Sequence, residues 1–309
     1  MTIQLMDSQA ALGFVTSQTS HIETQVNARK MPQIQYPGLI PVDTTAHPFA
    51  KSVTYFSSDK VGQAGWINGN AGDIPLVNGD MAKHETQVFM AGIGYGFGLE
   101  EVQQAQMLGL NLAADGAMAA RRACEEMIDR VAISGDSTKG LEGLINNSSV
   151  TVASAVTGGW TAATADQILG DVNAALQVVS TATNYVALSD TLLLPPSRMN
   201  LIASRRLGDT SMTILEFLLK NNIYTAQTGQ PLVIRTVRAL ETAGVGSVQR
   251  MIAYRRDPEV LKLHMPMAHR FLSAFTKTAL YTEVPGIFRL GGLDIRLPKE
   301  VIYVDGIGD

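Results

Sequence analysis

The chain has 309 residues, of which 46% are hydrophobic, so it is long enough for about two domains and can bury a sizeable core. Charged residues make up 17%, below the usual ~25%, and the net charge is -4, which disfavours a generally basic nucleic-acid-binding protein. The single cysteine, Cys124, excludes an intramolecular disulfide framework and a cysteine-cluster metal site. We expect a soluble protein made in a reducing cytoplasm, with no targeting or membrane-spanning segment.

The first part of the chain is predicted to be extended. Residues 1–30 carry only scattered apolar positions, and prolines recur from Pro32 to Pro48. Proline lacks a backbone N–H and restricts the residue before it, so this density disfavours regular helix. Strand-like segments follow at 51–67 and 85–95, separated by segments rich in Asn, Asp and Gly at 68–73 and 78–80 that read as turns.

Residues 49–98 are therefore predicted to form a long hairpin-like excursion. A two-stranded ribbon is only marginally stable alone in water, and its edges are templates for other chains. Such a ribbon lies either on its own domain or on another subunit. The second alternative is favoured because the arm before it is also extended and also lacks internal partners.

Helical patterns begin at Leu99, where Glu100 and Glu101 favour a helix N-terminus. A longer helix is predicted over 112–133, with small and apolar residues, including Cys124, in one stripe. Its charged residues are expected on a solvated face: Arg121, Arg122, Glu125, Glu126 and Asp129.

The remainder of the chain is predicted to be mixed α and β. Thr164 is expected to cap a helix, and Thr213 with Glu216 has capping-box spacing at the start of another. Residues 140–197 contain no Lys or Arg, so we expect this stretch to be packed against something. Strands are expected at 191–194, 232–237, 251–255, 277–284, 293–297 and 300–304.

No sequence motif points to catalysis. The glycines from Gly92 to Gly98 alternate strictly, which does not fit a dinucleotide-binding loop, and is typical of a strand face left bare for another backbone. The five histidines lack metal-ligand spacing, no Gly-x-Ser-x-Gly elbow is present, and Cys124 reads as a small core residue. We therefore predict no catalytic, cofactor-binding or metal site, and no cofactor.

The order of parts and several short segments resemble the major capsid proteins of tailed bacteriophages with the Hong Kong 97-type fold. The resemblance implies an α+β fold with an N-terminal arm (1–48), an extended loop (49–98), and a spine helix with a peripheral domain (99–150). It further implies an axial domain (151–270) and closing strands of the peripheral domain (271–309). The segments that carry it are 40–42, 51–55, 59–62, 120–123, 135–144, 190–195 and 301–304.

The function implied by the resemblance is assembly into pentamers and hexamers of an icosahedral phage head that encloses double-stranded DNA. Expected partners are other copies of the chain, with scaffolding, portal and decoration proteins, DNA bound without sequence specificity, and no membrane. Two alternatives remain open: an encapsulin-type compartment shell, and a cytosolic enzyme without recognisable motifs. The predicted intersubunit loop comprises Lys60, Gly65, Trp66, Asn68, Gly69, Asn70, Asp73, Asn78, Gly79 and Asp80.

Overall fold

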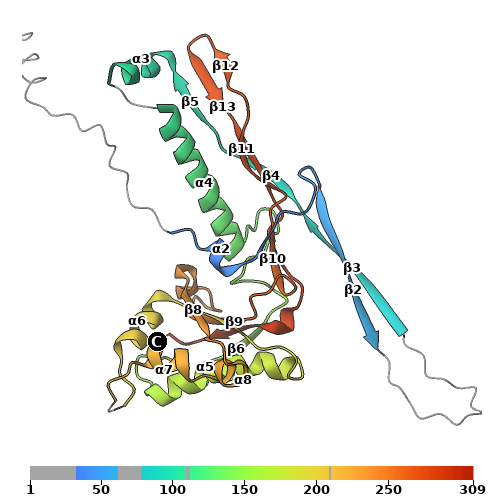
Figure 1. Ribbon diagram of the computed structural model, residues 1–309, viewed down its shortest axis with the longest axis vertical. Coiled ribbons are helices and arrows are strands. Elements are labelled where there is room, and N and C mark those ends of the chain that lie inside the picture. Colours follow the sequence, from blue (N-terminus) through green and yellow to red (C-terminus); the bar gives the residue numbers. More distant parts are fainter. Residues whose placement is uncertain (1–32, 62–77, 109–111, 209, 309) are drawn as a thin grey trace, which may run out of the picture.

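The computed structural model describes residues 33–61, 78–108, 112–208 and 210–308. It consists of a body built on a five-stranded sheet, a long arm of narrow sheets alongside a helix, and a two-stranded ribbon that projects away from both (Figure 1). Within these residues, no helix combines the length and apolar character that crossing a membrane requires.

The five-stranded sheet has the strand order β6-β16-β9-β7-β8, and only β9 runs antiparallel to its neighbours. Because successive side chains of a strand point to opposite faces, both faces of this sheet are buried in separate cores. Leu192 and Leu194 pack in one core while Leu193 packs in the other. The strands are β6 (Thr151–Ser154), β7 (Thr191–Leu194), β8 (Val233–Thr236), β9 (Arg250–Tyr254) and β16 (Val301–Asp305).

Helices cover one face of this sheet (Figure 1). The first has the complete capping box: the Thr164 hydroxyl accepts from the backbone of Gln167, whose side chain accepts from the backbone of Thr164. Thr213 likewise accepts from the backbone N–H of Glu216. The body's helices are α5 (Ala165–Ala182), α6 (Pro196–Ser204), α7 (Ile214–Lys220) and α8 (Ile223–Thr228), with 3-10 turns η1 (Arg238–Glu241) and η2 (Pro298–Glu300).

The long arm of the fold, which is not the predicted N-terminal arm (1–48), consists of strands from distant parts of the chain that pair beside α4 (Leu112–Ser134) (Figure 1). The helix α3 (Leu99–Leu108) lies at its far end. The buried stripe of α4 includes Cys124, Ile128 and Val131, which confirms the predicted core face. Three small sheets complete the arm and its junction with the body. Their strand orders are β11-β14-β4, β12-β13-β5 and β1-β10-β15.

These strands are β1 (Val42–Asp43), β4 (Phe89–Gly92), β5 (Tyr95–Gly98), β10 (Leu261–His264), β11 (Met267–Phe271), β12 (Phe275–Thr278), β13 (Tyr281–Val284), β14 (Gly286–Leu290) and β15 (Leu293–Ile295).

Two of the alternating glycines, Gly92 in β4 and Gly94 between β4 and β5, allow the close strand packing of the arm. A Cβ at Gly92 would lie 2.8 Å from the backbone oxygen of Gly286. A Cβ at Gly94 would overlap the backbone oxygen of Val284 and lie 2.8 Å from the Cα of Pro285. The structure thus confirms that these glycines admit a neighbouring backbone.

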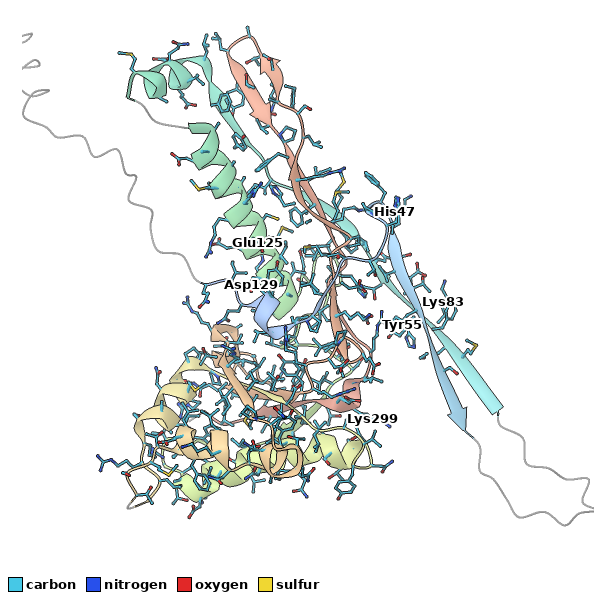
Figure 2. The ribbon with its side chains drawn as sticks, in the orientation of Figure 1. His47, Tyr55, Lys83, Glu125, Asp129 and Lys299 are labelled. Atoms are coloured by element: carbon cyan, nitrogen blue, oxygen red, sulfur yellow. The ribbon has the colours of Figure 1, made fainter. Side chains whose placement is uncertain are left out.

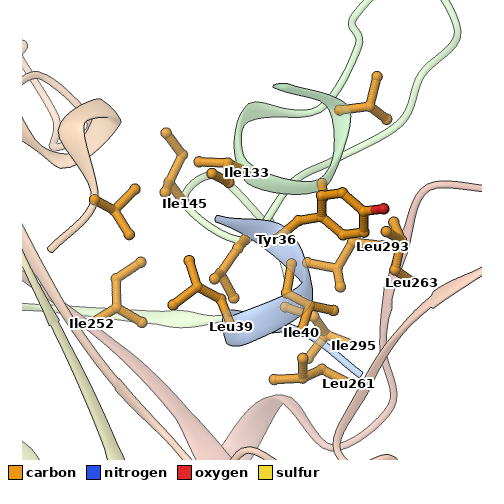
Figure 3. Packing of buried hydrophobic residues seen from close by; sticks show 14 of the residues in the cluster. Tyr36, Leu39, Ile40, Ile133, Ile145, Ile252, Leu261, Leu263, Leu293 and Ile295 are labelled. Atoms are coloured by element: carbon orange, nitrogen blue, oxygen red, sulfur yellow. The ribbon is translucent and has the colours of Figure 1, made fainter. Parts of the chain in front are cut away.

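The proline-rich segment contains one helical turn, α2 (Tyr36–Leu39), so the prediction of a wholly extended segment was wrong there. Pro37 is tolerated because it sits in the first turn, where its missing N–H would have no helical partner. The turn is buried among side chains of the arm and body, including Ile133 and Ile252 (Figure 3). Asp129 and Glu125 of α4 hold it, and so do not form the solvated surface expected for them.

The strand pairing groups some elements differently from the predicted segments. β16 joins the sheet of the body with β9, rather than the arm strands β12 and β13. β4 and β5 pair with β14 and β13, so the projecting ribbon is shorter than the excursion predicted over 49–98. These groupings depend on partners far away in sequence, which local patterns do not specify.

Candidate assembly surfaces

The projecting ribbon consists of β2 (Ser52–Val61) and β3 (Asn78–Gln87), which pair antiparallel over their full length and form a sheet of two strands (Figure 1). At its base, the backbone N–H of Val88 donates to the carbonyl of Lys51 at 2.8 Å. Within the described residues both edges of this ribbon are open, and much of its surface is left uncovered by its own chain.

The two faces of the ribbon differ in chemistry. On one face the rings of Tyr55 and His84 stack, with centroids 4.8 Å apart. The opposite face carries Phe56 and Met81, whose exposed fractions are 64% and 69%. The Lys83–Glu85 ion pair at 3.4 Å is also solvent-exposed, so its contribution to stability is small. An exposed aromatic and methionine on a ribbon are typical of a surface that another chain covers.

A charge network lies beneath the Tyr55 face. The Arg296 guanidinium stands 4.3 Å from the centroid of the Tyr55 ring and donates to Asp294 at 3.1 Å. His264, with 1% of its side chain exposed, contacts Asp294 at 3.3 Å through Nε2 and faces Asp43 at 3.7 Å through Nδ1. The network therefore joins β1, β10, β15 and the residue after β15 to the ribbon.

Burial and hydrogen bonding oppose each other at the two carboxyl groups of this network. Burial alone would raise the pKa of Asp294, but hydrogen bonds from His264 and Arg296 outweigh it, and the pKa is lowered. At Asp43, burial is likewise outweighed by hydrogen bonds from Thr45 and by the charge of Lys262, so its pKa is also lowered. Both groups are therefore held as carboxylates that can anchor the cations around them.

The chain segment that follows the N-terminal residues is fixed by α2. Oδ1 of Asp129 accepts the backbone N–H groups of Gln35 and Tyr36, each at 2.8 Å. The Tyr36 hydroxyl donates to Glu125 at 2.8 Å, and burial together with that carboxylate raises the pKa of Tyr36. Asp129 thus supplies the cap that Gln35 cannot give its own helix, because the Gln35 side chain donates to the carbonyl of Thr236.

The far end of the arm exposes a second group of apolar side chains, on α3 and on the β12–β13 hairpin. These side chains lie away from both described cores. They are Leu99, Met107, Phe275, Leu280 and Tyr281.

A family model described as Major capsid protein matches residues 62–307. The chain belongs to the major capsid protein family. It is a structural protein, a subunit of a capsid shell that assembles from copies of itself, and its place is the virion capsid. No curated protein sequence matches the chain.

The fold of the capsid protein is similar to those of solved shells. The capsid of Myoviridae phage XM1 gives a TM-score of 0.79 at 16% identity, covering 94% of this chain and 97% of that chain. The capsid of the empty GTA particle gives 0.66 at 10% identity, covering 97% and 99%. The virus-like particle from Pyrococcus furiosus gives 0.52 at 12% identity, covering 87% and 91%. These likenesses confirm the α+β, Hong Kong 97-type fold.

Part of the predicted intersubunit loop of the capsid protein falls in the ribbon. Lys60 is the register partner of Gly79, and Asn78 and Asp80 begin β3, so the turn predicted at 78–80 was wrong. Asn and Gly signal turns locally, but here their backbone pairs with residues 59–61. The other loop residues lie outside the described residues: Gly65, Trp66, Asn68, Gly69, Asn70 and Asp73.

Sequence reasoning missed the residues that give the ribbon its two faces. Tyr55 and Phe56 are consecutive, so in a strand they must point to opposite faces. That alternation, in an otherwise polar strand, was the available signal. The partners of the Tyr55 face, Arg296 and Asp294, lie some 240 residues further along the chain and carried no such signal.

Proposed function

We propose that the capsid protein assembles as pentamers and hexamers into an icosahedral phage head that encloses double-stranded DNA, and that the β2–β3 ribbon lies across a neighbouring copy. The observation that carries this proposal is the ribbon itself, with two exposed apolar side chains, Phe56 and Met81, on one face. Large permanent interfaces bury roughly 2,000–5,000 Å², which compensates for ordering extended segments. Membership of the family supplies the partner, a second copy.

Each of the predicted segments of the chain has its own role in the proposed assembly. In the proposal, the part of the N-terminal arm (1–48) that precedes α2 and the loop within 49–98 reach neighbouring copies, whereas the body, built from 151–270 together with β16, meets its counterparts at the capsomer centre. The arm of α4 with β11–β14 forms the peripheral part, joined by strands after 271. The role is structural rather than catalytic, the subunit is made in the host cytoplasm, and scaffolding, portal and decoration proteins complete the head.

A shortened ribbon tests this proposal. Ser57 and Ala82 are register partners, so an Asn-Gly turn in place of residues 58–81 can close the ribbon after its first six residue pairs and removes its outer part with Met81. We expect this variant to fold, as judged by circular dichroism and urea unfolding, yet to form no closed shells by electron microscopy. Closed shells of normal size from the shortened variant would refute the assignment of the ribbon to the intersubunit contact.

An encapsulin-type shell is the second candidate, because the fold is also similar to that of a virus-like particle. The TM-score of 0.52 for that particle is lower than the 0.79 for the phage XM1 capsid, which favours the phage head. The two functions differ in what the shell holds. Packaged DNA would support the phage head, whereas a co-purifying cargo enzyme held inside the shell would support the compartment.

A further inference from the structure

The ribbon meets the rest of its own chain through a narrow stack of side chains. Arg296 lies 4.3 Å from the Tyr55 ring centroid, and Tyr55 in turn stacks on His84 with an interplanar angle of 15°. Tyr55 and His84 are register partners, so this one stack contacts both strands. Figure 2 places Tyr55 and Lys83 on opposite sides of the ribbon, with Tyr55 toward the body.

The neighbouring side of the ribbon base is open. A pocket of about 250 Å³ separates residues 85–87 of β3 from the loop at 139–142, with Phe89 and Leu293 among its lining residues. Packing does not fill this space, so it does not fix the angle of the ribbon. Within the described residues, the stack on Arg296 is therefore the contact best placed to do so.

Arg296 is itself immobilised from behind. Its Nε donates to Asp294 at 3.1 Å, and the same carboxylate oxygen is 3.3 Å from Nε2 of the buried His264. The backbone N–H of Arg296 donates to the carbonyl of Val260 at 2.7 Å. A planar cation held at its edge by a buried carboxylate presents its face to an aromatic ring in one orientation.

We propose that Arg296 is a positioning residue for assembly: by stacking on Tyr55 it fixes the angle at which the ribbon leaves the subunit. This inference rests on the proposed function, in which the ribbon reaches a neighbouring copy. A ten-residue strand is about 33 Å long, so a tilt of about 10° at its base displaces its end by about 6 Å. Such a displacement is larger than the distances over which packed side chains stay in contact, so the end of the ribbon no longer meets its site on the neighbouring copy.

The stack of Arg296 on Tyr55, here called the clamp, affects assembly by setting the fraction of subunits whose ribbon is correctly placed. When only a fraction of subunits is competent to bind, the apparent affinity of each contact falls by that fraction. Every subunit of a shell uses the same contact, so the loss is repeated throughout the particle. Loosening the clamp should therefore slow assembly although no residue of the intersubunit contact has changed.

A distance measurement on unassembled full-length chain tests the clamp directly. Spin labels are placed at Ser58→Cys on the ribbon and Ser137→Cys in the loop after α4, both exposed positions. The native Cys124 is buried, and burial raises the pKa of its thiol to about 12, so it does not compete for label. Tyr55→Leu removes the ring, and Arg296→Lys keeps the charge while removing the planar stack. Phe56→Leu, on the opposite face of the same strand, is the matched control.

We expect a narrow distance distribution in the parent and in Phe56→Leu, and one at least about twofold wider in Tyr55→Leu and Arg296→Lys, given the 6 Å displacement for each 10° of tilt. Slower shell formation by Arg296→Lys should accompany the widening. Unchanged widths in both clamp variants, or an equally broad parent, would overturn the inference. Because this distance is measured in single subunits, its result does not depend on assembly. The clamp can therefore be refuted while the shortened-ribbon test supports the proposed function, and the clamp can be supported while that test refutes the proposed function.

Discussion

Asp129→Ala tests how the N-terminal segment is fixed to the subunit. The carboxylate accepts two backbone N–H groups of α2, each at 2.8 Å, and Tyr36 is 5% exposed. Removing the acceptor leaves these two donors without a partner in a largely buried site. Each such donor costs about 1–3 kcal/mol, so we expect the free energy of unfolding to fall by about 2–6 kcal/mol.

The effect of Asp129→Ala is measured by urea unfolding of the unassembled chain, followed by circular dichroism. Asp129→Asn keeps an oxygen that can accept both N–H groups, so its loss should be smaller, about 1 kcal/mol. Asp115→Asn, an exposed carboxylate on the same helix, is the control and should stay within about 0.5 kcal/mol of the parent. A loss for Asp129→Ala no larger than that of the control would refute the capping role.

Four further substitutions have effects of predictable sign. Gly94→Ala should destabilise the arm by about 1–3 kcal/mol in urea unfolding, because its Cβ would overlap the Val284 carbonyl. Gly170→Ala, in open space on α5, should instead stabilise the protein by up to about 1 kcal/mol in the same assay. Equal effects of the two substitutions would contradict the close packing at Gly94. Arg250→Met leaves the buried Asp305 carboxylate unpaired and should cost about 3–5 kcal/mol by the same measurement, so a change below 1 kcal/mol would count against a buried ion pair. Folding lowers the pKa of Asp294, so the stability contributed by its carboxylate is complete above the unfolded pKa of about 3.9 and is lost as the pH falls from there through the folded pKa. The free energy of unfolding, measured across this pH range, should therefore fall less on acidification in Asp294→Asn than in the parent. Identical pH profiles would contradict the prediction.

Local patterns were sufficient for elements whose stability is specified locally. The stripe containing Cys124 and Ile128 predicted the buried face of α4, because a helix places residues four apart on one side. Thr164 predicted the start of α5, since a cap acts within its own first turn. The alternating glycines predicted a close backbone approach, although they could not name the strands that approach.

Features that depend on partners far away in the chain could not be predicted from local sequence patterns. Asp129 looked like a solvated carboxylate because its two donors lie more than 90 residues away. The strands β10 and β14 are short and pair only with remote segments, so they were not predicted. Asn78 and Gly79 were read as a turn because pairing with the opposite strand overrode their local preference.

The predicted contact between subunits through a loop within 49–98 stays a prediction, and the chemistry of the candidate assembly surface was not predicted. A long hairpin beside an extended segment pointed to a contact between subunits, and six of the ten proposed residues lie outside the described part of the chain. The exposure of Phe56 and the stacking of Tyr55 on Arg296 became visible only when these two side chains were placed against their surroundings. A strand's two faces can be separated from sequence, but which face turns to the body cannot.

The most direct measurement of self-assembly is negative-stain electron microscopy of the purified full-length chain, with its mass determined by light scattering. We predict closed shells, tubes or ring-shaped capsomers, with masses that are multiples of the 33.1 kDa subunit at the level of pentamers and above. A single population of monomers or dimers, with none of these assemblies, would contradict the account.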